Sequence, residues 1–284
     1  MRTARLGTPA ASGWLRTLRP GDGPRLVCFA HAGGGAATFE PWSRLAPPRV
    51  RLDAVQLPGR EHRIGEPASD SLVDLADGIA AGLGAETGAR SPDVFFGHSM
   101  GALLAFETVR ALRRLGGTTP AHLVVAGSRA PHLPRATRVH DRPEPELVAE
   151  LHRLGGTPTE LLAELAAEGD SLDSLLPAVR ADFAAVETYV YLPEPPLPCG
   201  LTVLGGAGDA DVAESDLAAW AVQVRSAPTV AVLPGDHFFV RSPSLAEVVA
   251  HTTAPLDQVH SPDHAPDRTG DRGPAPLPQL EVRR

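Results

Sequence analysis

The sequence predicts an α/β protein with a mostly parallel central sheet flanked by helices. Short apolar runs alternate with amphipathic helical stretches along most of the chain. Several of these runs are continuously apolar, which is typical of parallel strands covered on both faces. With 284 residues the chain is long enough to bury the core of one large α/β domain. Regular strand–helix alternation of this kind favours a parallel sheet between layers of helices.

The individual elements follow from the same pattern. Strands are expected at residues 25–30, 50–56, 93–96, 121–126, 201–204 and 229–233. Helices are expected at about 37–46, 69–84, 100–115, 214–226 and 242–253. The last helix has Ser242 as a candidate N-cap and Pro243 at its first position, an arrangement that helix starts favour.

Three regions depart from the alternation. Residues 1–24 are expected to be an N-terminal extension, and residues 25–256 the folded domain. Within that domain, residues from about 131 to 195 lack strand-like runs. There, apolar residues recur at the three- and four-residue spacing of a helix face, at Leu176, Val179, Phe183, Val186 and Val190. This insertion is predicted to be a helical lid over the strand ends, with an ordinary helical subdomain as the alternative. Residues 257–284 are rich in proline and charge, which predicts a disordered tail.

The composition excludes several classes of protein. All 26 basic residues are arginine, so lysine-dependent Schiff-base and P-loop chemistries are excluded. A net charge of −8 argues against a nucleic-acid-binding surface. Two cysteines cannot form a disulfide framework. Neither a signal peptide nor a membrane-spanning run is recognisable, so we expect a soluble, cytoplasmic protein that contacts no membrane.

The segment 93–104 carries the strongest chemical signal. An apolar strand leads into Gly97-His98-Ser99-Met100-Gly101, and a helical pattern follows. In this setting a Gly-x-Ser-x-Gly motif is a sharp turn that exposes the serine at the strand end. The serine also precedes a helix N-terminus, where backbone N–H groups stabilise developing negative charge. Ser99 is therefore the candidate nucleophile.

A serine hydroxyl needs a base to accept its proton, and the order expected with this motif is Ser, then Asp or Glu, then His. His237 follows the predicted strand 229–233 and is the candidate base. Asp209 follows the strand 201–204 and is the candidate for orienting the imidazole, with Asp211 left open as an alternative. Asp236 adjoins the base in sequence and is interpreted as a turn residue.

An acyl-transfer serine also needs donors for the oxyanion. The backbone N–H of Met100, which follows the nucleophile, is one candidate. The glycine-rich loop at 29–35, after the first predicted strand, supplies the other, although a plain flexible turn would have the same composition.

These stretches resemble the type II thioesterases of polyketide and nonribosomal peptide synthesis, which belong to the α/β-hydrolase superfamily. The resemblance runs in order over about residues 25–250. It rests on 28–34, 54–61 (Ala-Val-Gln-Leu-Pro-Gly-Arg-Glu), 97–102, 154–158, 180–183, 205–209 and 235–239. The Gln-Leu-Pro-Gly-Arg-Glu stretch is the most particular of these to the family.

The resemblance implies an α/β-hydrolase fold with a helical lid and a triad of Ser99, Asp209 and His237. It places the backbone N–H groups of Ala32 and Met100 in the oxyanion hole. It also implies a stand-alone enzyme without metal or organic cofactor that hydrolyses acyl groups from the phosphopantetheine arm of carrier proteins, clearing stalled or misprimed chains. A patch for the carrier protein or for phosphopantetheine is expected at Arg129, Arg135, Arg138 and Arg142, with a solvated arginine face as the equal alternative.

Two other functions stay open. A general carboxylesterase or lipase of the same fold would prefer oxygen esters of free alcohols. A non-catalytic carrier-protein-binding homologue would keep the fold without activity, although the intact Ser, Asp and His argue against it.

Overall fold

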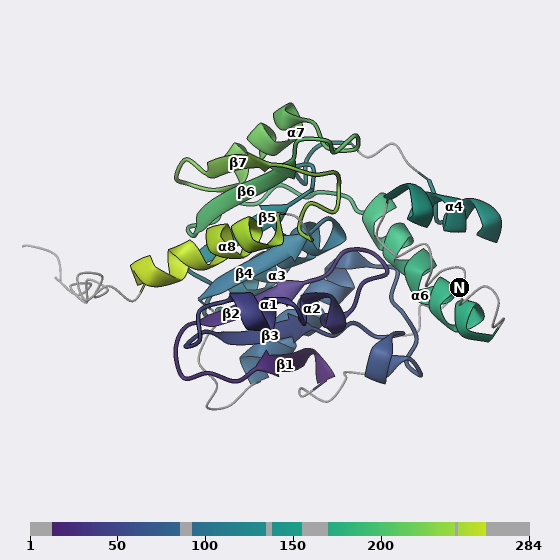
Figure 1. Cartoon of the computed structure of the whole chain (residues 1–284), viewed down its shortest axis with the longest axis horizontal. Coiled ribbons are helices and arrows are strands. Elements are labelled where there is room, and N and C mark those ends of the chain that lie inside the picture. The colour runs from purple at the N-terminus through teal and green to yellow at the C-terminus, as the bar shows by residue number, and fades with distance from the viewer. Residues whose placement is uncertain (1–12, 86–92, 135–137, 155–169, 242–243, 260–284) are drawn as a thin grey trace, which may run out of the picture.

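The computed structural model describes residues 13–85, 93–134, 138–154, 170–241 and 244–259. Its centre is a seven-stranded sheet in the order β1-β3-β2-β4-β5-β6-β7 (Figure 1). The strands are β1 (Leu15–Arg19), β2 (Arg25–Phe29), β3 (Arg51–Val55), β4 (Val94–His98), β5 (His122–Ala126), β6 (Gly200–Gly206) and β7 (Thr229–Leu233). All neighbouring pairs are parallel except β1 and β3, which are antiparallel. The mostly parallel α/β sheet expected from the sequence is confirmed.

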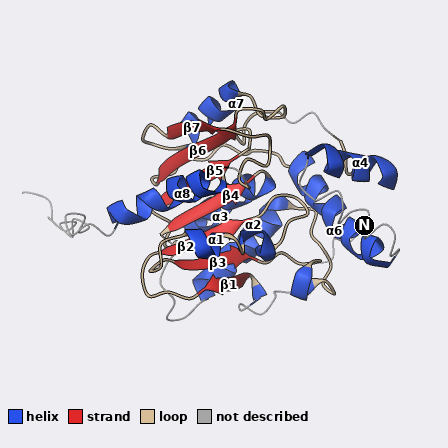
Figure 2. Cartoon of the chain, in the orientation of Figure 1, coloured by secondary structure: helices blue, strands red, loops and turns tan. Residues whose placement is uncertain are grey.

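Helices cover both faces of the sheet (Figure 2). Within the described residues the helices are η2 (Ala36–Phe39), α1 (Trp42–Leu45), η3 (Glu61–Arg63), α2 (Leu72–Ala85), α3 (Met100–Arg114), α4 (Glu144–Leu154), α6 (Asp170–Glu187), α7 (Glu214–Ala218), η4 (Ala219–Gln223) and α8 (Leu245–Val259). Alternate strand residues point to opposite faces. In β4, Phe95 therefore packs with α2 and α3, while Phe96 packs with α1 and α8. Each face thus has its own apolar core.

One strand of the sheet precedes residue 25, where the folded domain is predicted to begin. β1 lies within residues 1–24 and pairs with β3 at the edge of the sheet. Before it, Trp14 is buried against α2, where its ring fills the space that side chains at Gly78 and Gly82 would need. The segment was missed because β1 is only half-buried and lacks a continuous apolar run.

Two predicted helices are each split in the structure. The helix expected at 37–46 is η2 followed by α1, because Pro41 lies between them and lacks a backbone N–H. The helix expected at 214–226 is α7 followed by the tighter η4. The last helix begins within the described residues at Leu245, so the proposed cap at Ser242 and Pro243 lies outside them. The tail is likewise outside the described residues from 260 onward, and α8 extends past the expected boundary to Val259.

The insertion at 131–195 contains α4 and α6, which lie side by side at one end of the strands (Figure 1). They share a small apolar cluster of their own, with Val139, Leu147, Leu151, Leu176 and Val179. In the described part of the chain, no helix combines the length and apolarity needed to cross a membrane.

Candidate active site

Ser99 sits in a strained turn between β4 and α3. Its φ of 55° lies in the left-handed region, which non-glycine residues rarely adopt. The flanking glycines make this turn possible. A Cβ at Gly97 would lie 2.1 Å from the carbonyl oxygen of Gly101, and a Cβ at Gly101 would lie 2.1 Å from that of Phe29. The motif therefore has the strand–turn–helix setting that an exposed nucleophile needs.

The structure brings together the three side chains expected from the sequence. His237 Nε2 lies 3.1 Å from Ser99 Oγ, and His237 Nδ1 lies 2.8 Å from Asp209 Oδ2. The Asp209 side chain is fully buried and that of His237 is 11% exposed. Asp209 follows β6 and His237 follows β7, and these strands are neighbours in the sheet. Strand topology thus explains why residues far apart in sequence meet here.

Asp211, the alternative carboxylate, and Asp236, the expected turn residue, have other partners. Asp211 forms an ion pair with Arg153 of α4, with 3.1 Å between Asp211 Oδ1 and Arg153 Nη2. Its backbone N–H donates to Asp209 Oδ1 at 2.9 Å, which fixes the Asp209 carboxylate. Asp236 Oδ1 accepts the N–H of Phe238 at 2.8 Å, the contact of a turn residue. In this geometry Asp209 is the carboxylate that contacts the imidazole.

The two expected oxyanion donors follow neighbouring strands of the sheet. Met100 is the first residue of α3, where a backbone N–H has no acceptor within the helix. Ala32 is in the loop after β2, in a turn closed by a hydrogen bond from Gly34 N–H to the His31 carbonyl at 2.9 Å. β2 and β4 are adjacent strands, and Phe29 pairs with Gly97. Both amides therefore lie at the same strand ends as Ser99.

His98, the variable position of the serine motif, binds the backbone of the loop that carries His237, a contact that the sequence did not indicate. Its Nε2 lies 2.8 Å from the carbonyl oxygen of His237, so Nε2 carries the proton and donates. The ring is buried with those of His31 and Phe238. Burial lowers the pKa of His98 well below its ordinary value and that of His31 to about 3, with nearby cationic groups adding to the effect. Both rings are therefore neutral at pH 7.

One group of side chains in the described residues has the composition of a metal site. Asp209, Asp211 and His237 present ligand atoms within 4.8 Å of one another. Two of these atoms already share a direct hydrogen bond, and Asp211 is paired with Arg153. A metal ion would have to displace both contacts, so the arrangement fits an oriented imidazole better than a metal centre.

The arginines expected to form a basic patch have acidic neighbours. Arg129 forms an ion pair with Asp216, Arg138 with Asp141 and Arg142 with Glu146. Arg135 lies outside the described residues. These pairs reduce the positive charge that the three described arginines can present to a partner.

Comparison with known proteins identifies the family. The model of the thioesterase domain matches residues 24–254. The gramicidin S biosynthesis protein GrsT of Aneurinibacillus migulanus is 37% identical, over 76% of this chain and 82% of the relative. The thioesterase PikA5 of Streptomyces venezuelae is 35% identical, over 80% of each chain.

Solved structures agree with this match. The type II thioesterase BorB of the borrelidin biosynthetic cluster superposes with a TM-score of 0.75 at 32% identity, covering 87% of this chain and 97% of BorB. The type II thioesterase YbtT, of a yersiniabactin pathway, superposes with a TM-score of 0.74 at 30% identity, covering 86% of this chain and 99% of YbtT. The fold is therefore the α/β-hydrolase fold of the thioesterases. With the family model matching most of its length, the chain belongs to the thioesterase domain family.

Proposed function

We propose that this thioesterase removes acyl groups from the phosphopantetheine arm of carrier proteins, and so edits stalled or misprimed polyketide or nonribosomal peptide synthases. Relatives named for gramicidin S and structural neighbours named for borrelidin and yersiniabactin support this assignment. The observation that carries it is the contact chain from Ser99 through His237 to Asp209, with distances of 3.1 and 2.8 Å. A cytoplasmic location and a lid role for α4 and α6 are part of the same proposal.

The geometry supports a two-step acyl-enzyme mechanism. His237 Nε2 accepts the Ser99 proton as Oγ attacks the thioester carbonyl, and Asp209 stabilises the resulting imidazolium. The backbone N–H groups of Ala32 and Met100 hold the oxyanion of the tetrahedral intermediate. His237 returns its proton to the departing pantetheine thiol. His237 then takes a proton from water as the water oxygen attacks the acyl-serine carbonyl. The acyl–Oγ bond breaks, the free acid leaves, and His237 returns the proton to Ser99 Oγ. His237 serves as the acid and base in both steps of this mechanism.

The substrate class is tested with one acyl chain on two leaving groups. An acyl carrier protein thioester and a p-nitrophenyl ester of the same acid are compared by kcat/KM. The proposal predicts a clear preference for the carrier-bound thioester. A preference for the oxygen ester would instead favour a general carboxylesterase. Failure of Ser99 to react with a fluorophosphonate probe would favour a non-catalytic carrier-binding protein.

A further inference from the structure

The loop that carries Ala32 is rich in glycine, and its own backbone hydrogen bonds are few. Residues 33–35 are three consecutive glycines, and Gly33 has a φ of 78°. Glycine can adopt many backbone conformations, so a loop of consecutive glycines keeps one conformation only when other residues bind its backbone. An oxyanion donor stabilises a transition state only if it is already in position when charge develops. Some other part of the chain must therefore hold this loop.

Three charged side chains do contact it. Asp182 Oδ2 accepts the N–H of Gly33 at 2.7 Å. Arg60 Nη1 donates to the carbonyl of Gly34 at 3.0 Å. Glu61 Oε1 accepts the N–H of Ala37, just beyond the glycines, at 2.9 Å. Backbone groups on both sides of the loop are thus bound by side chains from elsewhere in the sequence.

Two of these side chains also bind each other. Arg60 Nη1 and Nη2 donate to Asp182 Oδ2 and Oδ1 at 2.6 and 2.7 Å, in a bidentate pair. The side chains of Arg60 and Asp182 are 5% and 1% exposed. A planar guanidinium fork on a carboxylate fixes orientation as well as distance, and burial protects the pair from water. Asp182 Oδ2 therefore receives both Arg60 and the Gly33 amide in a defined geometry.

The third residue stands in a strained backbone. Among the described residues, the non-glycine residues with a positive φ are Ser99 and Glu61, with Glu61 at 47°. Strain of this kind persists where the surrounding structure enforces it, and it concentrates at functional sites. A Cβ at residue 35 would lie 2.2 Å from Glu61 Oε1, so Gly35 makes room for this carboxylate. Glu61 is therefore held close to the loop at a conformational cost.

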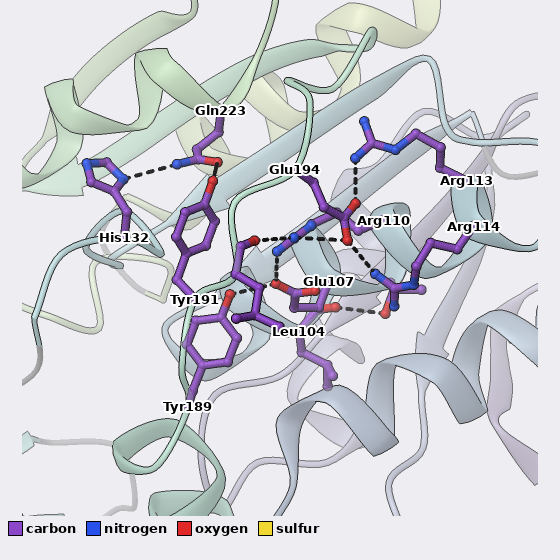
Figure 3. Close-up of polar contacts among 12 residues, drawn as sticks. Leu104, Glu107, Arg110, Arg113, Arg114, His132, Tyr189, Tyr191, Glu194 and Gln223 are labelled. Carbon is purple, nitrogen blue, oxygen red and sulfur yellow. Dashed lines mark hydrogen bonds and ion pairs between the residues drawn. The ribbon is translucent and has the colours of Figure 1, made fainter.

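Asp182 is itself fixed relative to the nucleophile. It lies on α6, and the segment after α6 is attached to α3, the helix that begins at Met100. Figure 3 shows this attachment: Tyr189 donates to Glu107 at 2.6 Å, and Glu194 accepts from Arg113 at 2.6 Å. The α3 helix, which supplies the Met100 amide, is thus also bonded to the segment that follows α6. The α6 helix in turn carries Asp182, which binds the loop of Ala32.

We propose that Arg60, Glu61 and Asp182 are positioning residues that hold the Ala32 amide in place opposite the Met100 amide. They do so through the loop backbone and contact no reacting atom. This inference rests on the proposed function, since it assumes that Ala32 and Met100 bind the oxyanion. It assigns a task to the Gln-Leu-Pro-Gly-Arg-Glu stretch and gives α6 a part in the active site as well as in the lid insertion.

The test is Asp182→Asn, assayed on an acyl carrier protein thioester. The neutral amide keeps the shape of the side chain but loses the ion pair and presents an N–H₂ group to Arg60 or to the Gly33 amide. We expect kcat to fall about 10- to 100-fold, somewhat less than for complete loss of one oxyanion donor, with KM within about threefold. An alkyl trifluoromethyl ketone, which forms a tetrahedral oxyanion with Ser99, should lose inhibitory potency in proportion to kcat.

The matched control is Asp53→Asn. Asp53 is also fully buried and pairs with Arg25 at 2.7 Å. It lies in the middle of β3, and Arg25 begins β2 at the end opposite to the Ala32 loop. This variant should lower the melting temperature and leave kcat unchanged when assayed well below that temperature. Equal losses of kcat in the two variants, unchanged kcat in Asp182→Asn, or a change confined to KM would overturn the proposal.

Glu61 provides a second test that does not disturb the buried ion pair. Glu61→Gln keeps an oxygen for the Ala37 amide and should retain most of kcat, whereas Glu61→Ala should lose about tenfold. Equal activity of the two would contradict a positioning role. The proposed function can be rejected independently of the positioning role. If the wild type does not hydrolyse thioesters, the proposed function is wrong. If the wild type is active and these variants match it, only the positioning role is wrong.

Discussion

Replacing Asp209 by asparagine should inactivate the enzyme by reversing the proton positions on His237. The backbone N–H of Asp211 donates to Asp209 Oδ1, so an asparagine here keeps its oxygen on that side. Its N–H₂ group then occupies the position of Oδ2, 2.8 Å from His237 Nδ1, and donates to it. The imidazole proton must move to Nε2, which faces Ser99 Oγ at 3.1 Å and can no longer accept its proton. The side chain remains buried and nearly isosteric, so the fold should be unaffected.

The expected loss follows from this tautomer change. A wrong tautomer in a serine triad lowers kcat by about 10⁴-fold, or about 5.5 kcal/mol in transition-state stabilisation. The assay is steady-state hydrolysis of an acyl carrier protein thioester, with melting temperature as the check on folding. Asp211→Asn is the matched control two residues away, and it should lose less than about threefold because Asp211 pairs with Arg153 at the surface. Near-normal kcat in Asp209→Asn, or a large loss in Asp211→Asn, would refute the assignment of the carboxylate.

Three further predictions address the surroundings of the site. His98→Leu removes the donor to the His237 carbonyl and should destabilise the fold by about 1–3 kcal/mol in urea unfolding and lower kcat; a fully active, equally stable variant would contradict the positioning of that loop by His98. Trp14→Ala should cost about 3–5 kcal/mol of unfolding free energy, because its ring is buried against α2; a change under about 1 kcal/mol would mean that residues before β2 are dispensable to the fold. Burial lowers the pKa of His31 to about 3, so between pH 6.5 and 3 the unfolded chain binds a proton that the folded protein does not. The free energy of unfolding should therefore fall as the pH drops through this window, and between pH 7 and 5 His31 should account for about 2 kcal/mol of that loss. Urea unfolding of His31→Asn should lack this contribution. Equal pH dependence in both proteins would contradict a neutral buried His31.

The central strands could be predicted because they are buried on both faces. Both β4 and β5 are apolar runs with a histidine at one end, and the glycine motif marks the turn after β4. β1 could not be found in this way, because an edge strand that is half-exposed alternates with charged residues and resembles a loop. The split of the helix expected at 214–226 into α7 and η4 also leaves no clear mark in the apolar spacing.

The candidate site was predictable where a motif and a strand end coincide. Ser99, Asp209 and His237 each follow a predicted strand, so the topology of a parallel sheet brings them together. Asp182 and His98 act through backbone groups of distant loops, Gly33 N–H and the His237 carbonyl. Contacts between a side chain and a distant backbone group leave no recognisable pattern of residue types in the sequence, so they could not be predicted from it. For Asp182, the signal was the family-specific stretch at 180–183, which marked the residue without revealing its partner.

In the proposed mechanism Ser99 carries the acyl group during hydrolysis. Wild-type protein and Ser99→Ala are each mixed with an acyl carrier protein thioester, quenched within one turnover and measured by intact-protein and peptide mass spectrometry. We expect an acyl adduct on the peptide containing Ser99 in the wild type, and neither adduct nor hydrolysis above background in Ser99→Ala. Hydrolysis by Ser99→Ala at a rate close to the wild type, or an acyl group on another residue, would contradict it.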